Sequence, residues 1–379
     1  MSNKKLTICF FATAYSFHTL KWARYFSESG HDVHLISYDQ LISKDIGNIK
    51  VHIIKKTFPI IMWLFNTLLN LPMAIIKARK MVKKINPDII HAHCVTSYGT
   101  LASRLGFHPL IITAWGSDIL VNAQKNLIVK LATQYVLKKA DLITCDAEHM
   151  KRAMVNLKAE PSKIKIINFG VDTKKFSPGV KSQELKEKFN AVNSNIIISL
   201  RSLEPLYNVE TLVRAIPIVI KLFPEAVFVI AGSGPEEKKL KDLALSLNIE
   251  NNVRFVGWIS NDDLPRYLRT ADIYVSTSLS DAGIASSTAE AMACELPVVI
   301  TDSGENKEWV RDGENGFFIP SKDYKKLAER IIFLLENGKE RQKLGKNARK
   351  KIQEKNDYYN EMAKMEKIYY KLAILKRVA

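Results

Sequence analysis

Cysteine is scarce in this chain of 379 residues, and no two cysteines lie close together in the sequence. The four of them, Cys9, Cys94, Cys145 and Cys294, show no spacing typical of a metal site or a redox pair. Their arrangement excludes a disulfide-stabilised secreted scaffold and favours a reducing cytoplasm. The N-terminus also lacks the apolar segment of a signal peptide, because its short apolar run fits a first strand.

Acidic residues are few compared with basic ones. The chain has 56 lysines and arginines against 39 aspartates and glutamates, which gives a formal net charge of +17. A surplus of this size suits a partner such as nucleic acid, an anionic membrane or a phosphorylated substrate. A general preference for lysine on helix surfaces is the alternative explanation.

No uninterrupted apolar run is long enough to span a membrane. Residues 57–76 carry no charge, but Asn66 and Pro72 interrupt them, and a spanning helix needs about 20 apolar residues. A basic stretch follows. Residues 57–84 therefore fit either a helix lying in the membrane interface with a basic end, or a buried helix of the first domain with a solvated basic tail.

Short apolar runs alternate with longer stretches of helical periodicity, which predicts an α/β protein with parallel sheets covered by helices on both faces. In the first half the predicted strands are Leu6–Ala12, His31–Ser37, Asp88–His93, Leu110–Ala114 and Asp141–Asp146, with a helix over Thr19–Ser29. In the second half they are Asn195–Leu200, Ala226–Ala231, Val253–Val256, Ile273–Ser276 and Pro297–Thr301. The turn-rich residues between the two sets predict a linker. We therefore predict two Rossmann-like domains, residues 1–172 and 173–350, followed by a C-terminal helix within residues 351–379.

Arg201 directly follows a predicted strand, and in sheets of this kind ligands bind beyond the carboxyl ends of the strands. Its guanidinium could hold a diphosphate with two hydrogen bonds and neutralise the charge that develops on a leaving phosphate. Because most arginines are surface residues, Arg201 alone is weak support for a site. Gly232 and Gly234 follow another predicted strand and are interpreted as a tight turn, since a lone Gly-x-Gly is a weak signal.

A loop of small residues follows the strand that ends at Ser276 and leads into a helix predicted to begin at Ser286 or Ser287. Small residues allow backbone amides to approach a ligand, and a helix N-terminus favours an anion. Asp281 could hold the hydroxyls of a sugar, and Glu290, one turn into the helix, could accept hydrogen bonds from a ribose. The alternative is a capping loop with a first-turn glutamate stabilised by the helix dipole.

Three polar loops follow predicted strands in the first half of the chain. His18 lies beyond the first strand, His93 ends another, and Asp118 lies beyond a third. His93 and Asp118 could bind hydroxyls of an acceptor or donor sugar, and His18 could contact a phosphate or the acceptor. A single histidine is more often structural, but three such loops at one sheet edge favour a ligand site.

The order of these motifs resembles that of the family-four glycosyltransferases, whose GT-B fold consists of two Rossmann-like domains facing each other across a cleft. The residues that carry the resemblance in the second half are Arg201, Ala231–Gly234, Val253–Gly257, Glu290–Ala293, Pro297–Val299 and Asn315–Phe317. In the first half they are Ala140–Asp141 and Gly170–Asp172, followed by Phe176 and Pro178. No single motif is specific, but the series covers nearly the whole chain.

The resemblance implies a retaining enzyme that takes its sugar from a nucleotide-sugar donor, here expected to be UDP-linked, with no cofactor and no metal ion. The sequence contains no Asp-x-Asp, the metal-diphosphate motif of the other large glycosyltransferase fold. By resemblance, Arg201 binds the donor diphosphate, Glu290 binds the ribose, and the loop that contains Gly257 lies near the base.

The resemblance also assigns a role to each predicted domain. Residues 1–172 become the acceptor-binding domain and residues 173–350 the nucleotide-sugar-binding domain. The helix within residues 351–379 is expected to pack back on the first domain, as it does in the family.

The chain departs from the family pattern at two places in the donor site. The first glutamate of the family's paired-glutamate motif is absent, and we predict that Asp281 and nearby backbone amides take over its work. We predict that the donor-binding residues of this loop are Gly283, Ile284, Ala285 and Ser286. The family's lysine after the arginine is also absent, and Tyr207 lies in its region, so neutralisation of the diphosphate rests more on Arg201.

The predicted function is transfer of a hexosyl or N-acetylhexosaminyl group to a glycan or a polyprenyl-diphosphate-linked acceptor, in the cytoplasm or peripherally on the inner face of the cell membrane. The implied mechanism is front-face attack, in which the leaving phosphate takes the acceptor proton and no carboxylate base is needed. An inactive nucleotide-sugar-binding scaffold and a sugar-nucleotide epimerase of the same fold are the alternatives. A nucleic-acid-binding protein is not favoured, because no binding module accompanies the charge.

Overall fold

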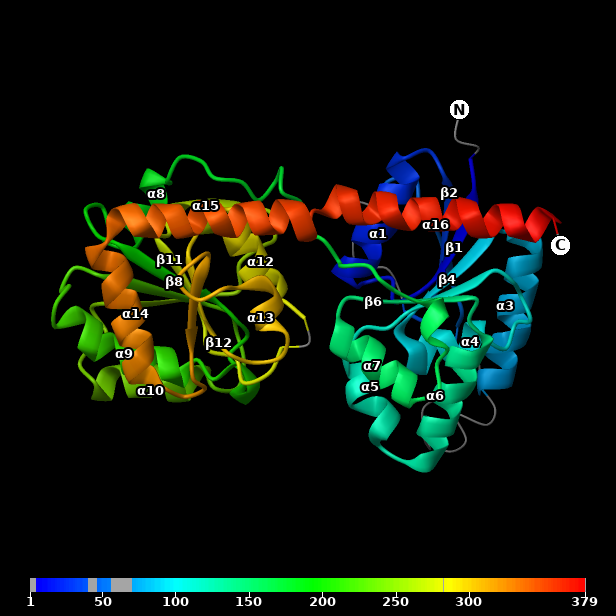
Figure 1. Cartoon of the computed structure of the whole chain (residues 1–379), viewed down its shortest axis with the longest axis horizontal. Helices are drawn as coiled ribbons and strands as arrows, with labels where there is room; N and C mark the ends of the chain where they lie inside the picture. The colour runs from blue at the N-terminus through cyan, green and yellow to red at the C-terminus, as the bar shows by residue number, and fades with distance from the viewer. Residues whose placement is uncertain (1–4, 40–45, 56–69, 282, 379) are drawn as a thin grey trace. The chain divides into compact units, whose positions relative to one another are not determined.

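The computed structural model describes residues 5–39, 46–55, 70–281 and 283–378 (Figure 1). The chain forms two compact units, one made of Met1–Phe169 and Tyr359–Ala379 and the other of Gly170–Tyr358. Each unit is built around one parallel sheet. The predicted α/β class with two parallel sheets is therefore confirmed.

The sheet of the first unit has, within the described residues, seven parallel strands in the order β3-β2-β1-β4-β5-β6-β7. The strands are β1 Thr7–Phe11, β2 Asp32–Ser37, β3 Lys50–Ile53, β4 Ile89–His93, β5 Leu110–Thr113, β6 Leu142–Cys145 and β7 Ile164–Ile166. The helices are α1 Phe17–Glu28, α3 Leu71–Ile85, α4 Thr100–Ala102, α5 Ser117–Leu120, α6 Leu127–Lys139, α7 Glu148–Asn156 and α16 Tyr358–Val378. The central strands β4 and β5 are buried along their whole length, as strands covered on both faces must be.

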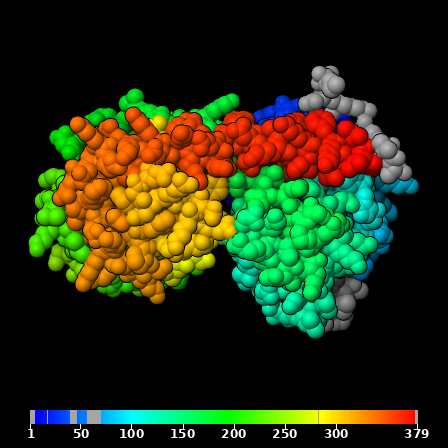
Figure 2. Space-filling model, viewed as in Figure 1, coloured from blue at the N-terminus to red at the C-terminus, as the bar shows by residue number. Residues whose placement is uncertain are grey.

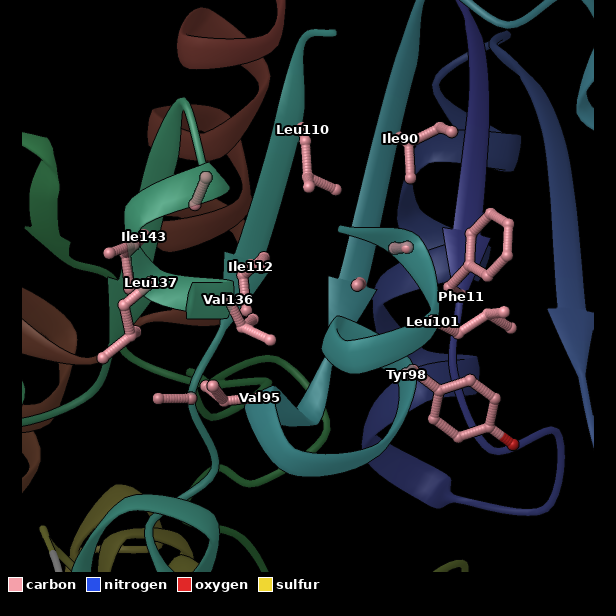
Figure 3. Packing of buried hydrophobic residues seen from close by; sticks show 14 of the residues in the cluster. Phe11, Ile90, Val95, Tyr98, Leu101, Leu110, Ile112, Val136, Leu137 and Ile143 are labelled. Atoms are coloured by element: carbon pink, nitrogen blue, oxygen red, sulfur yellow. The ribbon is translucent and has the colours of Figure 1, made fainter. Parts of the chain in front are cut away.

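One face of this sheet packs on the hydrophobic core shown in Figure 3. Leu110 and Ile112 of β5 are two residues apart and therefore point to the same face. On that face they belong to one core with Ile90 of β4 and with Val136 and Leu137 of α6. The core fixes the sheet against α6 and so fixes where the loops after β1, β4 and β5 emerge.

The sheet of the second unit has, within the part of the chain that the structure describes, six parallel strands in the order β10-β9-β8-β11-β12-β13. The strands are β8 Ile196–Leu200, β9 Val227–Ala231, β10 Val253–Gly257, β11 Ile273–Ser276, β12 Val298–Thr301 and β13 Gly316–Ile319. The helices are α8 Gln183–Lys188, α9 Glu210–Ile220, α10 Glu237–Ser246, α11 Leu264–Thr270, α12 Ser286–Ala293, α13 Asn306–Trp309, α14 Tyr324–Glu336 and α15 Gly338–Lys355. One core cluster includes α12 and α15 and a second includes α9 and α14, so both faces of the sheet are covered.

The last helix, α16, belongs to the first unit although it follows the second unit in the sequence. A 2.6 Å hydrogen bond joins Tyr369 Oη of α16 to His91 Nδ1 of β4, and both side chains are fully buried. Glu361 Oε2 accepts a hydrogen bond from the Asn168 backbone amide at 2.9 Å. The outer side of α16 lies on the surface of the molecule, drawn in red in Figure 2.

Three strands of the structure were not among those predicted from the sequence. β3 and β7 are the two edges of the first sheet, and β13 is one edge of the second. An edge strand buries less of its surface, so its apolar run is shorter and gives a weaker signal. β3 illustrates this, because none of its four residues is buried.

The uncharged stretch expected to lie in a membrane interface or in the core falls mostly outside the described residues, and only its end is seen, as the start of α3. The buried residues of α3 are Ala74, Ala78 and Val82, which lie on one side of the helix and contribute to the core of the first unit. No helix among the described residues is both long and apolar enough to cross a membrane.

Candidate functional site

Arg201 directly follows β8 and is held by two residues of the loop after β11. Its Nη2 donates to Asp281 Oδ1 at 2.6 Å and to Ser278 Oγ at 3.4 Å. The side chains of the Arg201–Asp281 ion pair are each 9% exposed. Because β8 and β11 are neighbours in the sheet, their ends bring together residues that lie 80 positions apart.

The guanidinium of this ion pair also faces an aromatic ring and has one hydrogen-bond donor that no described residue uses. Its Cζ lies 4.2 Å from the centroid of the Tyr207 ring, and its Nε is buried with no hydrogen-bond partner among the described residues. Burial raises the pKa of Asp281, while the charge of Arg201 and its hydrogen bond act in the opposite direction. A buried cation with an unused N–H at the end of a strand is well suited to an anionic group such as a phosphate.

Two glycines in the turn after β9 support the segment that carries Arg201. A Cβ added at Gly232 would lie 2.2 Å from the carbonyl oxygen of Arg201, and one at Gly234 would lie 2.4 Å from that of Leu203. The turn therefore comes closer to this segment than any residue with a side chain would allow. The Gly232 amide also donates to the Gly257 carbonyl at 2.8 Å, which places Gly257 beside the same turn.

The loop that carries Asp281 is fixed by the loop after β12. Thr301 Oγ1 and Ser303 Oγ both donate to the Ser278 carbonyl, the second at 3.3 Å. Gly304 has a φ of +57°, and a Cβ on it would lie 1.8 Å from the Asp281 carbonyl oxygen. The position of Asp281 therefore depends on close contact between its backbone carbonyl and Gly304, which only a residue without a side chain allows.

The Asp281 loop leads into α12, which begins at Ser286 as the sequence suggested. Its N-cap is Ala285, which has no side chain that could accept from the first-turn amides. Gly283 is buried, Ile284 packs against the core, and Glu290 is half-buried on the helix. This loop can therefore present backbone amides to an anion, as expected for the start of a helix after a loop of small residues.

Sequence reasoning did not single out Ser278 or Tyr207 as site residues. Ser278 lay within the small-residue loop but resembled the serines around it. Tyr207 stood out only as one of the residues in the region of an absent lysine. Its contact with Arg201 has no local sequence signature, because it depends on how the loop after β8 folds back on itself.

In the first unit, an aromatic cluster forms from one helix and three strand ends. It contains His18 and Trp22 of α1, His93 at the end of β4, Trp115 after β5 and Phe169 after β7. The His93 ring centroid is 5.3 Å from that of Trp22 and 5.6 Å from that of Trp115. The His18 ring centroid is 5.1 Å from that of Phe169 and 5.8 Å from that of Trp115. The start of α1 and the ends of β4, β5 and β7 thus meet at one edge of the sheet.

Burial keeps the two histidines of this cluster neutral. It lowers the pKa of His93 to about 3, with a further contribution from His18. It also lowers the pKa of His18 to about 4, with a smaller effect from Lys21. His93 is 2% exposed, and neither of its ring nitrogens has a hydrogen-bond partner among the described residues. A neutral imidazole in that state has one donor and one acceptor that no described residue uses.

Asp118, the third residue predicted for this site, is buried and bonded to the backbone. Its Oδ2 accepts from the Val95 amide at 2.7 Å, and its Oδ1 accepts from the Trp115 amide at 3.0 Å. Burial raises its pKa although these amide bonds act against the shift. In the structure both oxygens hold the loops after β4 and β5 together, and the contact with ligand hydroxyls suggested by the sequence stays a prediction.

We expect His93→Phe to reduce the loss of stability on acidification. The pKa of His93 is about 3 in the folded protein against an ordinary value of 6.5, so the unfolded chain takes up a proton first as the pH falls. This histidine alone should lower the free energy of unfolding by about 2 kcal/mol between pH 7 and pH 5. Urea unfolding at both pH values measures the loss. Equal losses in the native protein and the variant would contradict the low pKa.

Solved structures share this architecture over nearly the whole chain. The Anabaena protein Alr3699/HepE in complex with UDP has a TM-score of 0.81 at 17% identity and covers 97% of this chain and 100% of its own. A glycosyltransferase from Rickettsia africae has a TM-score of 0.83 at 19% identity and covers 97% and 99%. Two units of this kind, each built on a parallel sheet, define the GT-B class of fold, as the sequence predicted.

Two family models match the sequence. The model described as "Glycosyl transferase 4-like" matches residues 7–147, and the one described as "Glycosyl transferases group 1" matches residues 181–351. Together they cover more than half of the chain, which belongs to the family-four glycosyltransferases. The predicted family and its general activity, sugar transfer from a nucleotide-sugar donor, are confirmed.

Curated relatives differ in donor and acceptor. The Escherichia coli UDP-Gal:alpha-D-GlcNAc-diphosphoundecaprenol alpha-1,3-galactosyltransferase is 26% identical over 314 residues, which is 80% of each chain. The GDP-mannose-dependent alpha-(1-6)-phosphatidylinositol monomannoside mannosyltransferase of Mycolicibacterium smegmatis is 24% identical over 244 residues, 62% of this chain and 63% of its own. Their names state two donor nucleotides and two acceptors, so similarity to these relatives does not determine which sugar this chain transfers.

Proposed function

We propose that this glycosyltransferase moves a hexosyl or N-acetylhexosaminyl group from a UDP-sugar to a lipid-linked glycan acceptor, with retention of configuration and without a metal ion. The observation that carries the proposal is the buried guanidinium of Arg201, whose Nε has no partner among the described residues. A fixed cation of this kind can bind the donor diphosphate and stabilise it as it leaves, which is the task a metal ion performs elsewhere.

On the donor side, we assign one part of the nucleotide-sugar to each element. Arg201 binds the diphosphate and Asp281 the sugar hydroxyls, and their ion pair keeps both groups at one place. Residues 283–286 add backbone amides to the phosphate contact. Glu290 accepts from the ribose hydroxyls, and Gly257 lies near the base. Residues 173–350 thus form the proposed nucleotide-sugar-binding domain.

On the acceptor side, we propose that His18 and His93 contact the acceptor sugar and that residues 1–172 form the acceptor-binding domain. Both histidines have a lowered pKa and are neutral near pH 7, which suits an uncharged hydroxyl better than a phosphate. The acceptors in the names of the Escherichia coli and Mycolicibacterium relatives support a lipid-linked acceptor. The net charge of +17 supports a place on the inner, anionic face of the cell membrane.

We expect UDP to raise the thermal unfolding midpoint of the native protein and Glu290→Ala to abolish that rise. A ligand that binds only the folded state, at a hundred times its dissociation constant, adds about 2.7 kcal/mol of stability. Thermal unfolding with UDP, GDP, ADP, TDP and CMP in turn identifies the base.

Glu237→Ala is the matched control, because Glu237 is a first-turn glutamate of α10 that pairs with Lys241 and should leave the UDP response unchanged. An equal response in the Glu290 variant would remove the ribose assignment. If no nucleotide stabilises the native protein, the donor site is degenerate and the chain is a scaffold. Release of free UDP and sugar in the absence of any acceptor would instead indicate the epimerase.

A further inference from the structure

The outward face of two consecutive helices in the first unit is apolar. Six large hydrophobic side chains on α5, on α6 and between them are 38% to 80% exposed. These residues, which define the α5–α6 face, are Leu120, Val121, Leu127, Ile128, Leu131 and Tyr135. The short turn Asn122–Gln124 joins the two helices and contacts both, so the six exposed side chains lie on adjoining elements of the unit. Figure 1 shows α5 and α6 at the end of the first unit that lies away from α16.

The spacing of residues along α6 gives the helix two apolar sides. Leu127, Leu131 and Tyr135 are four residues apart and therefore lie on one side. Val136 and Leu137 lie on the other side and pack into the core (Figure 3). A surface helix normally presents polar residues to solvent. Packing within the fold explains the inner side of α6 but gives no reason for the outer one.

The same surface is basic. Between Asp118 and Asp141 the sequence has no acidic residue and four lysines. The lysines are Lys125, Lys130, Lys138 and Lys139. Lys139 Nζ and Arg104 Cζ lie 5.8 Å and 5.2 Å from the centroid of the Tyr135 ring, so cations border the apolar side chains directly.

A second basic surface adjoins the first through Arg104. Arg79 of α3 donates from Nη2 to the Arg104 carbonyl at 2.7 Å. Arg79 and its neighbours Lys80, Lys83 and Lys84 are exposed on α3. The α5–α6 face is therefore bounded by positive charge along the edge where α3 approaches it.

We propose that the α5–α6 face docks onto an anionic lipid bilayer. Apolar side chains bordered by lysines on a helix lying flat are the arrangement that binds a membrane interface, and the lysines add attraction to anionic headgroups. A dimer formed through this face is disfavoured, because it would bring lysines of the two copies together. Residues 119–140 contain no carboxylate side chain that could neutralise them. The inference rests on the lipid-linked acceptor proposed above, since such an acceptor is taken from a membrane.

Co-sedimentation of the full chain with vesicles tests the docking surface. The vesicles are phosphatidylcholine with or without phosphatidylglycerol. Ile128→Ser combined with Leu131→Ser is expected to weaken binding to the anionic vesicles at least about tenfold, because two apolar side chains no longer leave water. Lys130→Gln combined with Lys138→Gln is expected to weaken it about fivefold for each lysine, and only where phosphatidylglycerol is present.

Leu222→Ser combined with Leu245→Ser is the matched control, because these leucines are 59% and 60% exposed on the second unit. The control should bind vesicles as the native protein does. The inference is overturned if the control loses as much binding as the Ile128 and Leu131 variant, or if that variant binds like the native protein. It is also overturned if the native protein does not bind anionic vesicles. The same holds if the native protein forms a dimer that the Ile128 and Leu131 variant abolishes.

Two measurements on the same proteins separate this inference from the proposed function. UDP binding, and transfer to a lipid-linked acceptor dissolved in detergent, should both survive in the Ile128 and Leu131 variant. If the native protein binds vesicles through this face but transfers to no lipid-linked acceptor, the proposed acceptor class is wrong and the proposed docking surface is retained. If transfer occurs while the face does not affect vesicle binding, only the surface assignment is wrong.

Discussion

Arg201→Met is expected to lower kcat/KM for sugar transfer about a thousandfold. The variant loses the buried cation that would stabilise the leaving diphosphate, and the loss of one such group typically costs a factor of about 100 to 1,000, or more for an arginine on a phosphate. Charge on the leaving group is greatest in the transition state, so kcat should carry most of the loss. Steady-state release of UDP in the presence of the acceptor measures both constants.

The same substitution also leaves Asp281 buried without its cation, which typically costs about 3–5 kcal/mol. Arg201→Met combined with Asp281→Asn removes both charges and should recover most of the stability, while transfer stays at least as low as in the single variant. Arg214→Met is the matched control, since Arg214 is a half-exposed arginine of α9 that pairs with Glu210 and should keep native activity. A charge-free double variant that folds and transfers at the native rate would refute the assignment of Arg201.

Gly304→Ala is expected to destabilise the second unit by about 3 kcal/mol or more and to weaken UDP binding. The new Cβ would lie 1.8 Å from the Asp281 carbonyl oxygen, a backbone atom that can move only if its loop moves. That movement would draw Asp281 away from Arg201 and so disturb the proposed diphosphate site. Urea unfolding and a UDP titration measure the two effects separately.

Gly313→Ala provides the control for backbone conformation. Gly313 has a φ of +74°, close to the +57° of Gly304, but the nearest atom to its added Cβ is Phe317 Cε1 at 4.0 Å. This variant should lose only about 1–2 kcal/mol of stability, the cost of placing an alanine in the left-handed backbone conformation. Similar destabilisation by the two variants would mean that the approach of Gly304 to Asp281 contributes nothing.

The placement of Arg201 after a strand could be predicted because β8 is a continuous buried run, as central strands of parallel sheets are. The same reasoning located the strand that ends at His93 and the strand that precedes the Asp281 loop. It missed β3, which has four residues and no buried position, because an edge strand need not be apolar.

The ion pair between Arg201 and Asp281 could not be predicted from local pattern. It exists because β8 lies next to β11 although β9 and β10 come between them in the sequence, and strand order of this kind is set by the whole sheet. The contact of Phe169 with His18 has the same origin, since Phe169 follows the last strand of the first sheet and His18 follows the first strand. The sequence placed the loops of His18, His93 and Asp118 at one sheet edge, but it gave no signal that Phe169 would join them.

The return of α16 to the first unit has a consequence for the order in which the protein is assembled. Tyr369 is fully buried against Phe26, with ring centroids 4.8 Å apart, and is bonded to His91. On the ribosome the first 169 residues emerge long before this tyrosine does. Until then Phe26 and His91 lack the partner that covers them. The unit that is synthesised first is therefore completed last, and a chain halted before α16 would contain a finished second unit and an unfinished first one.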